Sequence, residues 1–299
     1  MKNILKSTTF LAIVACWLWS TAFAGVKIGL QYHTPFQFAG FRFIISGLLI
    51  LLVYRNWEKF YREIREHWQF VVLIGLIQVF AQYALFYSGM NLVPGALGAM
   101  IVGSSPLFVA LVAHFSFHND RMNGVKTASI LVGVAGIAII TLGRQKVEMK
   151  GALEWLGILL LLFNNLVSGY SNVLVAKSKR NISPVVLSAS SLLLGGLLLF
   201  LISVPIEGFP QQPFPLEYYV ALGWLGFLSA AALTIWYALL GRPGVKVSLL
   251  NTWKFLIPVS GALLSWMLLS NEKPDWTSAI GMAFIAVSLV LLNRGRNSR

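Results

Sequence analysis

Long apolar stretches constrain this chain more than any other feature. Of its 299 residues, 57% are hydrophobic and only 11% are charged, which is outside the usual composition of soluble domains. A helix needs about 20 mostly apolar residues to cross a bilayer. Ten such stretches occur, near residues 8–29, 34–54, 69–89, 93–115, 124–142, 153–176, 184–205, 217–240, 246–269 and 275–293. The sequence therefore predicts an all-α integral membrane protein with ten transmembrane helices.

The basic residues predict an orientation rather than a nucleic-acid partner. Nucleic-acid-binding proteins cluster basic residues on one soluble face, whereas here they are spread over short loops. With the N-terminus inside, 16 of the 23 Lys and Arg residues fall in inner segments and 5 in outer ones; the other two, Arg42 and Lys254, lie within apolar stretches. This excess follows the positive-inside rule. We expect a multi-pass protein of the cell (inner) membrane with both termini cytoplasmic, as a monomer or homodimer.

The N-terminus also permits a second interpretation. Lys2 and Lys6 precede an apolar run that ends in Ala22-Phe23-Ala24-Gly25, as in a cleavable signal peptide. Cleavage would leave nine spans and would place the positive-rich loops at odds with the N-terminus. We therefore favour a first transmembrane helix.

An internal repeat with an offset of 152 residues divides the chain. Pro106, Ala110 and Leu111 recur as Pro258, Ala262 and Leu263, and the segment 119–121 (Asn-Asp-Arg) recurs at 271–273 (Asn-Glu-Lys). The polar segment 143–151 separates five stretches from five, so we expect one repeat over 1–143 and another over 144–299. Two repeats with an odd number of crossings must insert in opposite directions, an arrangement typical of secondary transporters.

Lys254 is the strongest candidate for a functional group. It lies about eight residues into its apolar stretch, roughly 12 Å at the helical rise, where a charge costs about 2.5–3.5 kcal/mol unless it is paired or hydrated. Snorkelling to the inner interface is the alternative. Arg42 is about seven residues into its stretch, and its longer side chain could reach the interface.

Other polar and aromatic residues are spaced so that they could line a common space. Gln78 and Gln82 share one helix face, and Asn164, Ser168 and Asn172 share another. Bonding between helices is the alternative role for each residue taken singly. The predicted substrate-binding set is Lys254, Trp253, Asn251, Gln78, Gln82, Tyr83, Asn164, Ser168, Trp236 and Trp17. Trp19 could join it.

Several patterns bear on mechanism. Pro106 and Pro258 interrupt apolar stretches, so we expect paired bends, or hinges, at these two residues. All ten acidic residues lie in loops or at the ends of stretches, which leaves no intramembrane carboxylate for ion coupling. Transport would then be uncoupled, or would use His114, the one histidine within a stretch. One cysteine, Cys16, excludes an intrachain disulfide, and no motif indicates a metal or cofactor.

Several residues give a resemblance to a known family. The segment 19–23 (Trp-Ser-Thr-Ala-Phe) with Lys27, Pro35 and Arg42 resembles the opening pattern of the drug/metabolite transporter superfamily, EamA-domain type. A proline within an apolar helix that ends in an acid, as at Pro106/Asp120 and Pro258/Glu272, is similar to that family's helices 4 and 9. The resemblance implies two inverted five-helix repeats around a central cavity. Asp120 stands where Glu is usual, and the second repeat lacks the opening pattern.

Together these features favour a facilitator or exporter of small metabolites, most of all amino acids or related amphipathic solutes. Lys254 would bind a carboxylate and the aromatic residues an apolar side chain. Efflux of hydrophobic drugs is a close alternative. A membrane-embedded enzyme is a weaker one, because His114, His118 and Asp120 match no helical face and no catalytic motif is present.

Overall fold

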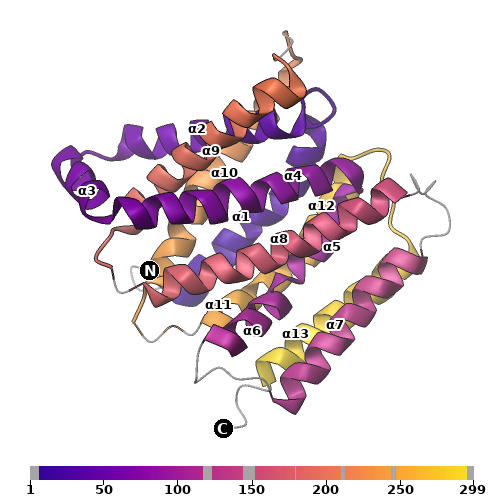
Figure 1. Cartoon of the computed structure of the whole chain (residues 1–299). Helices are drawn as coiled ribbons and strands as arrows, with labels where there is room; N and C mark the ends of the chain where they lie inside the picture. Colours follow the sequence, from indigo (N-terminus) through magenta and orange to yellow (C-terminus); the bar gives the residue numbers. More distant parts are fainter. Residues whose placement is uncertain are drawn as a thin grey trace.

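The protein is built from helices. A computed structural model describes residues 7–116, 123–143, 152–178, 180–209, 213–243, 245 and 247–294, and all regular elements within these ranges are helical (Figure 1). The elements are α1 (Thr8–Gly29), α2 (Pro35–Val53), α3 (Trp57–Ile74), η1 (Gly75–Ala81), α4 (Gln82–Leu92), α5 (Gly95–Gly103), α6 (Ser105–Ser116), α7 (Gly124–Gly143), α8 (Ala152–Lys177), α9 (Pro184–Glu207), α10 (Leu216–Leu240), α11 (Val247–Thr252), η2 (Trp253–Phe255), α12 (Leu256–Leu268) and α13 (Trp276–Arg294).

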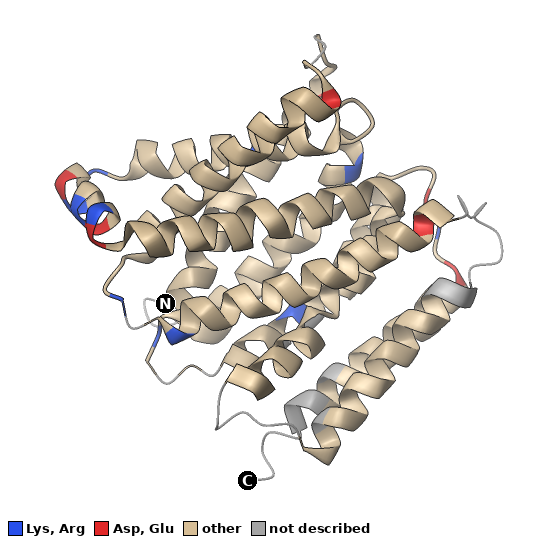
Figure 2. Ribbon diagram, in the orientation of Figure 1, with Lys and Arg blue, Asp and Glu red and all other residues tan. Residues whose placement is uncertain are grey.

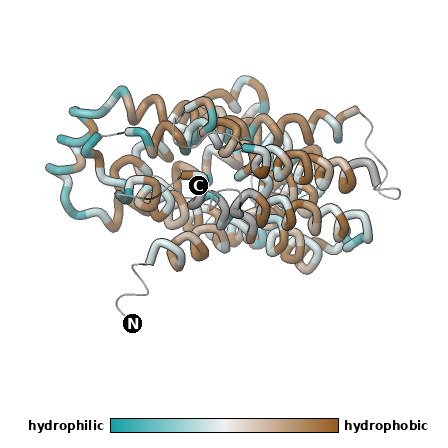
Figure 3. Tube along the Cα trace, turned by 90° about the horizontal axis from the view of Figure 1, so that it is seen from below, coloured by the Kyte–Doolittle hydropathy of each residue, from teal (hydrophilic) through white to brown (hydrophobic). Residues whose placement is uncertain are grey.

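These helices make the chain a multi-pass membrane protein. In the described ranges, seven continuous helical segments are long and apolar enough to cross a bilayer. Three shorter apolar helices accompany them: Thr127–Ile140, Leu256–Leu268 and Trp276–Ser288. Hydrophobic residues run along the helices and hydrophilic ones gather mostly at their ends (Figure 3). Because hydrocarbon offers no hydrogen-bond partners, helices that satisfy their own backbone are the expected solution.

Helices from the two halves of the chain pack against each other. The first half contributes α1 to α7 and the second α8 to α13. α1 packs on α10 and α12, while α8 packs on α4 and α6. α2 packs on α9, α5 on α12, and α7 on α13, the last pair lying at one side of the bundle (Figure 1). Most of the core is therefore an interface between the halves.

Carboxylates bind the starts of helices from other parts of the chain. Glu207 accepts hydrogen bonds from the backbone N–H groups of Phe36 and Gln37, at the start of α2, over 2.9 and 3.0 Å. Glu272 accepts from Gly95 and Ala96, the first residues of α5. The first N–H groups of a helix lack partners within it and carry partial positive charge. Both carboxylates thus satisfy helix starts, whereas other acidic residues lie along α3 together with basic ones (Figure 2).

The loop before α2 is held by a buried histidine. Nδ1 of His33 lies 2.6 Å from Oη of Tyr218, and Nε2 lies 2.9 Å from Oε1 of Gln37. An amide oxygen only accepts, so Nε2 donates to Gln37 and Nδ1 accepts from Tyr218. Burial lowers the pKa of His33, which favours this neutral ring. The network joins the start of α2 to α10.

Glycines bring the backbones of α2 and α9 together. A Cβ atom on Gly40 would lie 2.9 Å from the backbone N of Phe200, and one on Gly196 would lie 2.8 Å from the backbone N of Ile44. Small residues permit such close approach between membrane helices. Likewise, a Cβ on Gly103 would lie 2.2 Å from Cδ of Pro258. The proline ring of one half therefore packs directly on the backbone of the other.

Gly40→Ala is expected to destabilise the protein. Alanine gains about 1 kcal/mol of helix propensity over glycine, but overpacking against immobile backbone costs about 1–3 kcal/mol, so the midpoint of thermal unfolding in detergent should fall. Gly223→Ala is the matched control, because apart from its chain neighbours and the adjacent backbone of its own helix no atom lies within 4 Å of the added Cβ, and its midpoint should stay or rise. A Gly40→Ala protein as stable as the control would contradict the close α2–α9 packing.

Candidate functional site

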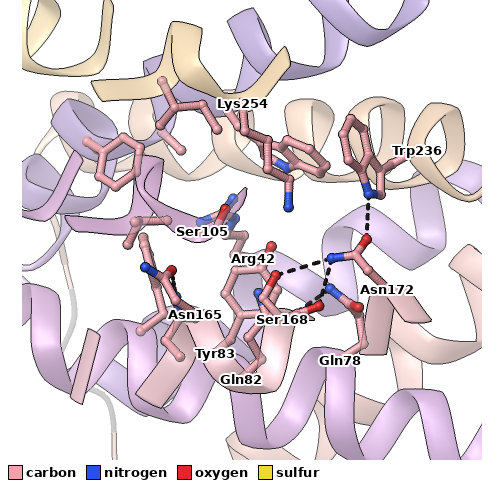
Figure 4. A pocket seen from close by; sticks show the side chains of 17 residues that line it. Arg42, Gln78, Gln82, Tyr83, Ser105, Asn165, Ser168, Asn172, Trp236 and Lys254 are labelled. Carbon is pink, nitrogen blue, oxygen red and sulfur yellow. Dashed lines mark hydrogen bonds between the residues drawn. The ribbon is translucent and has the colours of Figure 1, made fainter. Parts of the chain in front are cut away.

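An internal cavity lies where the two halves meet. Residues of α1, α2, η1, α4, α5 and α6 line it from the first half, and residues of α8, α10, η2 and α12 from the second (Figure 4). It encloses about 70 Å³, whereas sites for drug-sized ligands usually measure about 300–1,000 Å³. In this conformation it has room for a few water molecules, so a metabolite would enter only after helices or side chains move.

Lys254 points into the cavity between two indole rings. It lies on η2, a single 3₁₀ turn between α11 and α12, and its side chain is only 6% exposed. Nζ is 5.0 Å from the ring centre of Trp236 and 5.5 Å from that of Trp19, within the range of cation–π attraction. The two indoles contact each other edge to face at 5.0 Å. Burial among these rings excludes snorkelling of Lys254 to the interface.

Arg42 is held at the cavity by neutral groups. Its Nε donates to Oγ of Ser229 over 2.8 Å and its Nη1 donates to Oη of Tyr87 over 2.9 Å. The guanidinium carbon lies 5.0 Å from the ring centre of Phe43 and 5.8 Å from that of Tyr83. The side chain of Arg42 is long enough to reach the membrane interface, but it does not do so, because only 1% of its surface is exposed. It is a buried cation of the site.

A row of amides forms the opposite wall. Trp236 donates through Nε1 to Oδ1 of Asn172 over 2.7 Å, and Asn172 donates through Nδ2 to the backbone carbonyl of Ser168. Gln78 donates to Gln82 over 2.9 Å; Gln78 lies in η1, a π-helix, a distortion often found at functional sites. These bonds fix the side chains while leaving polar atoms toward the cavity.

The break between α5 and α6 exposes polar groups beside the amides. Pro106 has no N–H to donate to the carbonyl of Val102, four residues earlier, and the helix is interrupted at Ser104. Asn165 donates to the neighbouring carbonyl of Ile101 over 2.7 Å. The buried oxygen Oδ1 of Asn164 has no hydrogen-bond partner among the described residues. It is an acceptor available to a solute.

The structure brings most of the predicted set together. Seven of the ten predicted residues line the cavity: Lys254, Gln78, Gln82, Tyr83, Asn164, Ser168 and Trp236. The other three do not. Trp17 is 52% exposed on the outer face of α1, Trp253 is packed against the core beside Lys254, and Asn251 is buried with Nδ2 bonded to the carbonyl of Val247 in its own helix.

The sequence could have assigned Trp19 in place of Trp17. Two residues along a helix rotate a side chain by about 200°, so the two tryptophans point to opposite faces. Trp19 is three and four residues from Ala22 and Phe23, which also line the cavity. Arg42 was treated as able to snorkel because nothing in the sequence reveals its partners Ser229 and Tyr87, which lie on α10 and α4.

Of the remaining candidates, only His114 lies within the described residues. His114 lies on α6, outside the lining residues, and contacts the ring of Phe115. His118 and Asp120 lie outside the described residues. Within the described ranges, no group of three or more His, Cys, Asp or Glu side chains could hold a metal ion.

Comparison with known proteins identifies the family. The sequence pattern of the EamA-like transporter family matches residues 6–142 and again residues 155–294. The chain belongs to the EamA-like transporter family. An uncharacterized transporter of Synechocystis sp. is 27% identical, with 98% of this chain and 91% of that protein covered. An uncharacterized transporter of Archaeoglobus fulgidus is 25% identical over 92% of this chain and 93% of that protein. This EamA-like protein is a membrane transporter and not an enzyme.

Two further relatives extend the comparison. A protein of Chlamydia trachomatis named as an S-adenosylmethionine/S-adenosylhomocysteine transporter is 22% identical, with 97% of this chain and 90% of that protein covered. A crystal structure that is 21% identical in sequence superposes with a TM-score of 0.75 and covers 98% of both chains. The EamA-like chain thus shares its whole fold with a solved structure.

Tyr87→Phe is expected to destabilise the site. The change removes the hydroxyl that accepts from Nη1 of Arg42, and a hydrogen bond to a charged group is worth roughly 1.5–3 kcal/mol. The midpoint of thermal unfolding should therefore fall. Tyr61→Phe, on an exposed residue of α3, serves as the matched control and should leave the midpoint unchanged. Equal midpoints for the two variants would argue against a hydrogen-bonded Arg42.

Proposed function

We propose that this transporter moves small metabolites by alternating access between two inverted five-helix repeats, residues 1–143 and 144–299. Amino acids or related amphipathic solutes are the favoured substrates. The seven long helical segments and three shorter apolar helices would give ten crossings, five in each repeat. The family pattern matches the chain twice, once in each proposed repeat. In such proteins, exchange of the conformations of the two repeats opens the site to opposite sides in turn.

The helix packing supports this symmetry. Exchange of the proposed repeats maps α1 on α8, α2 on α9 and α10 on the segment from α3 to α4. The observed pair α1–α10 then maps on α8–α4, and α1–α12 maps on α8–α6. The pair α5–α12 maps on α11–α6, which is also observed, and the pairs α2–α9 and α7–α13 map on themselves. A pseudo-two-fold axis between the halves accounts for all of these pairs.

The observation that carries the proposal is that equivalent positions of the repeat meet at the cavity. Val102 and Lys254 are 152 residues apart, as are Ser105 and Ile257, and all four line it. A site on the axis stays in place while the helices around it tilt, as alternating access requires. The breaks before Pro106 and Pro258 would supply the two hinges.

The lining suits an amphipathic solute. Lys254 and the amides would bind polar groups, while Trp19, Trp236 and Phe86 would bind an apolar part. The Chlamydia relative is named for two amino-acid derivatives, which agrees with this class. The aromatic lining equally favours a second function, efflux of hydrophobic compounds.

Transport by reconstituted protein tests the proposal. A thermal-shift screen over amino acids, their derivatives and hydrophobic dyes selects ligands, and each hit is then followed by counterflow in proteoliposomes. Trp236→Ala should reduce the flux strongly, because it removes the ring beside Lys254 and the donor to Asn172. Trp276→Ala, which alters an indole that is 84% exposed, should transport normally. Absence of counterflow for every ligand that binds would contradict a transport function.

The proposed topology places both termini in the cytoplasm. Arg55, Lys59, Arg62 and Arg65 cluster at the start of α3, near the end of the bundle where the chain begins (Figure 2), in keeping with the positive-inside rule. With Cys16 replaced by serine, an impermeant maleimide should label Lys273→Cys in right-side-out vesicles and Lys59→Cys only after permeabilisation. The reverse pattern would invert the topology.

A further inference from the structure

The cavity holds two buried cations and no anion. Among its lining residues, all of them within the described ranges, Arg42 and Lys254 are basic and none is Asp or Glu. The partners of Arg42 are two hydroxyls and aromatic rings, and those of Lys254 are two indoles. An ammonium has three donors and a guanidinium five, so most of their bonding capacity faces the cavity, as Figure 4 shows for Lys254.

The energetic cost of these charges indicates what they bind. A charge within the bilayer is costly unless it is paired or hydrated, and cation–π contacts offset only part of that cost. A solute without a carboxylate would leave both charges uncompensated, and a cationic group on the solute would add to the repulsion. A carboxylate compensates them with charge-assisted hydrogen bonds. Oδ1 of Asn164, buried and without a partner in the described part of the chain, would accept from an O–H or N–H of the same solute.

We propose that the cavity selects organic anions that carry a carboxylate and a neighbouring hydrogen-bond donor, and that the membrane potential drives them outward. The inference rests on the proposed transport function and adds the charge of the solute and the direction of transport. Lys254 and Arg42 come from opposite halves of the chain, so the anion is bound between them. Both residues bind the substrate.

The electrical argument follows one cycle of transport. When the cavity opens inward it is near the potential of the cytoplasm, which is negative, and this state favours an empty cationic site. A monoanion that binds there cancels one of the two positive charges, so the loaded carrier reorients against less electrical opposition than the empty carrier would meet. After release outside, the potential returns the cationic empty carrier to the inward-open state. Each cycle moves negative charge outward, in the direction that the potential favours.

The composition of the cavity also explains why no second ion is needed. Proton- and cation-coupled carriers commonly place a carboxylate in the membrane, whereas the carboxylates Glu207 and Glu272 are bonded to the starts of α2 and α5. One elementary charge in a potential of 100 mV corresponds to about 2.3 kcal/mol, an equilibrium concentration ratio of about 50. This ratio is the expected limit for uncoupled movement of a monoanion.

Three solutes that share a phenyl ring and differ in charge test the inference. They are 3-phenyllactate (one negative charge), phenylalanine (zwitterion) and phenylalaninamide (one positive charge). Binding is measured by thermal shift. Uptake is measured in proteoliposomes with valinomycin and potassium gradients that set the interior at zero or at +100 mV, and uptake by protein-free liposomes is subtracted. We expect 3-phenyllactate to bind best and to accumulate toward about 50-fold at +100 mV.

Variants distinguish a loss of uptake caused by removal of a charge from one caused by damage to the fold. Lys254→Met should lower 3-phenyllactate uptake at least about tenfold, since removal of one partner from a buried charge pair is costly. Lys254→Arg and Arg42→Lys keep the charge, and they should keep potential-driven accumulation of the anion even if the rate falls. Lys273→Gln removes an exposed lysine and is the matched control, with wild-type uptake expected.

The outcomes distinguish this inference from transport itself. Uptake of phenylalanine or phenylalaninamide that exceeds uptake of the anion, or anion uptake that is insensitive to potential, would overturn the inference and leave a transporter. Anion binding that depends on Lys254, without any flux, would overturn transport and leave an anion site. Failure of 3-phenyllactate both to bind and to cross the membrane would overturn the inference outright.

Discussion

Hydrocarbon offers no partner for a polar group, and most of the internal organisation of this protein follows from that constraint. The backbone is satisfied by helices, and the free N–H groups at the starts of α2 and α5 receive the carboxylates of Glu207 and Glu272. Where Pro106 interrupts a helix, Asn165 bonds the nearby carbonyl of Ile101. At the cavity this pairing is left incomplete, because Oδ1 of Asn164 has no hydrogen-bond partner among the described residues.

The periodic features of the fold could be predicted from the sequence. Apolar length located the helices to within a few residues, because burial in lipid imposes a minimum length that composition reveals. The third stretch was less well placed: α3 begins at Trp57, with polar residues in its first turns and a kink at His67. The caps could not be predicted, because Glu207 and Glu272 bind segments more than 170 residues away.

In the candidate site, too, some features could be predicted from the sequence and others only from the fold. Polar residues with helical spacing, such as Gln78 and Gln82, were expected to face inward because amides facing lipid are costly, and they line the cavity. Trp17 was assigned without regard to which face of α1 is buried, and Trp19 lines the cavity instead. Arg42 needed the three-dimensional structure, since its length alone permits either the interface or the interior. Its burial depends on Ser229 and Tyr87, which only the fold brings near.

The contact between Gly103 and Pro258 has a mechanical consequence. A proline ring against bare backbone leaves no flexible side chain between the two helices to absorb displacement. Tilting α12 must therefore displace α5, and the converse holds equally. The two halves of the chain therefore contact each other rigidly beside the cavity, so a movement of one half is transmitted to the other next to the proposed binding site.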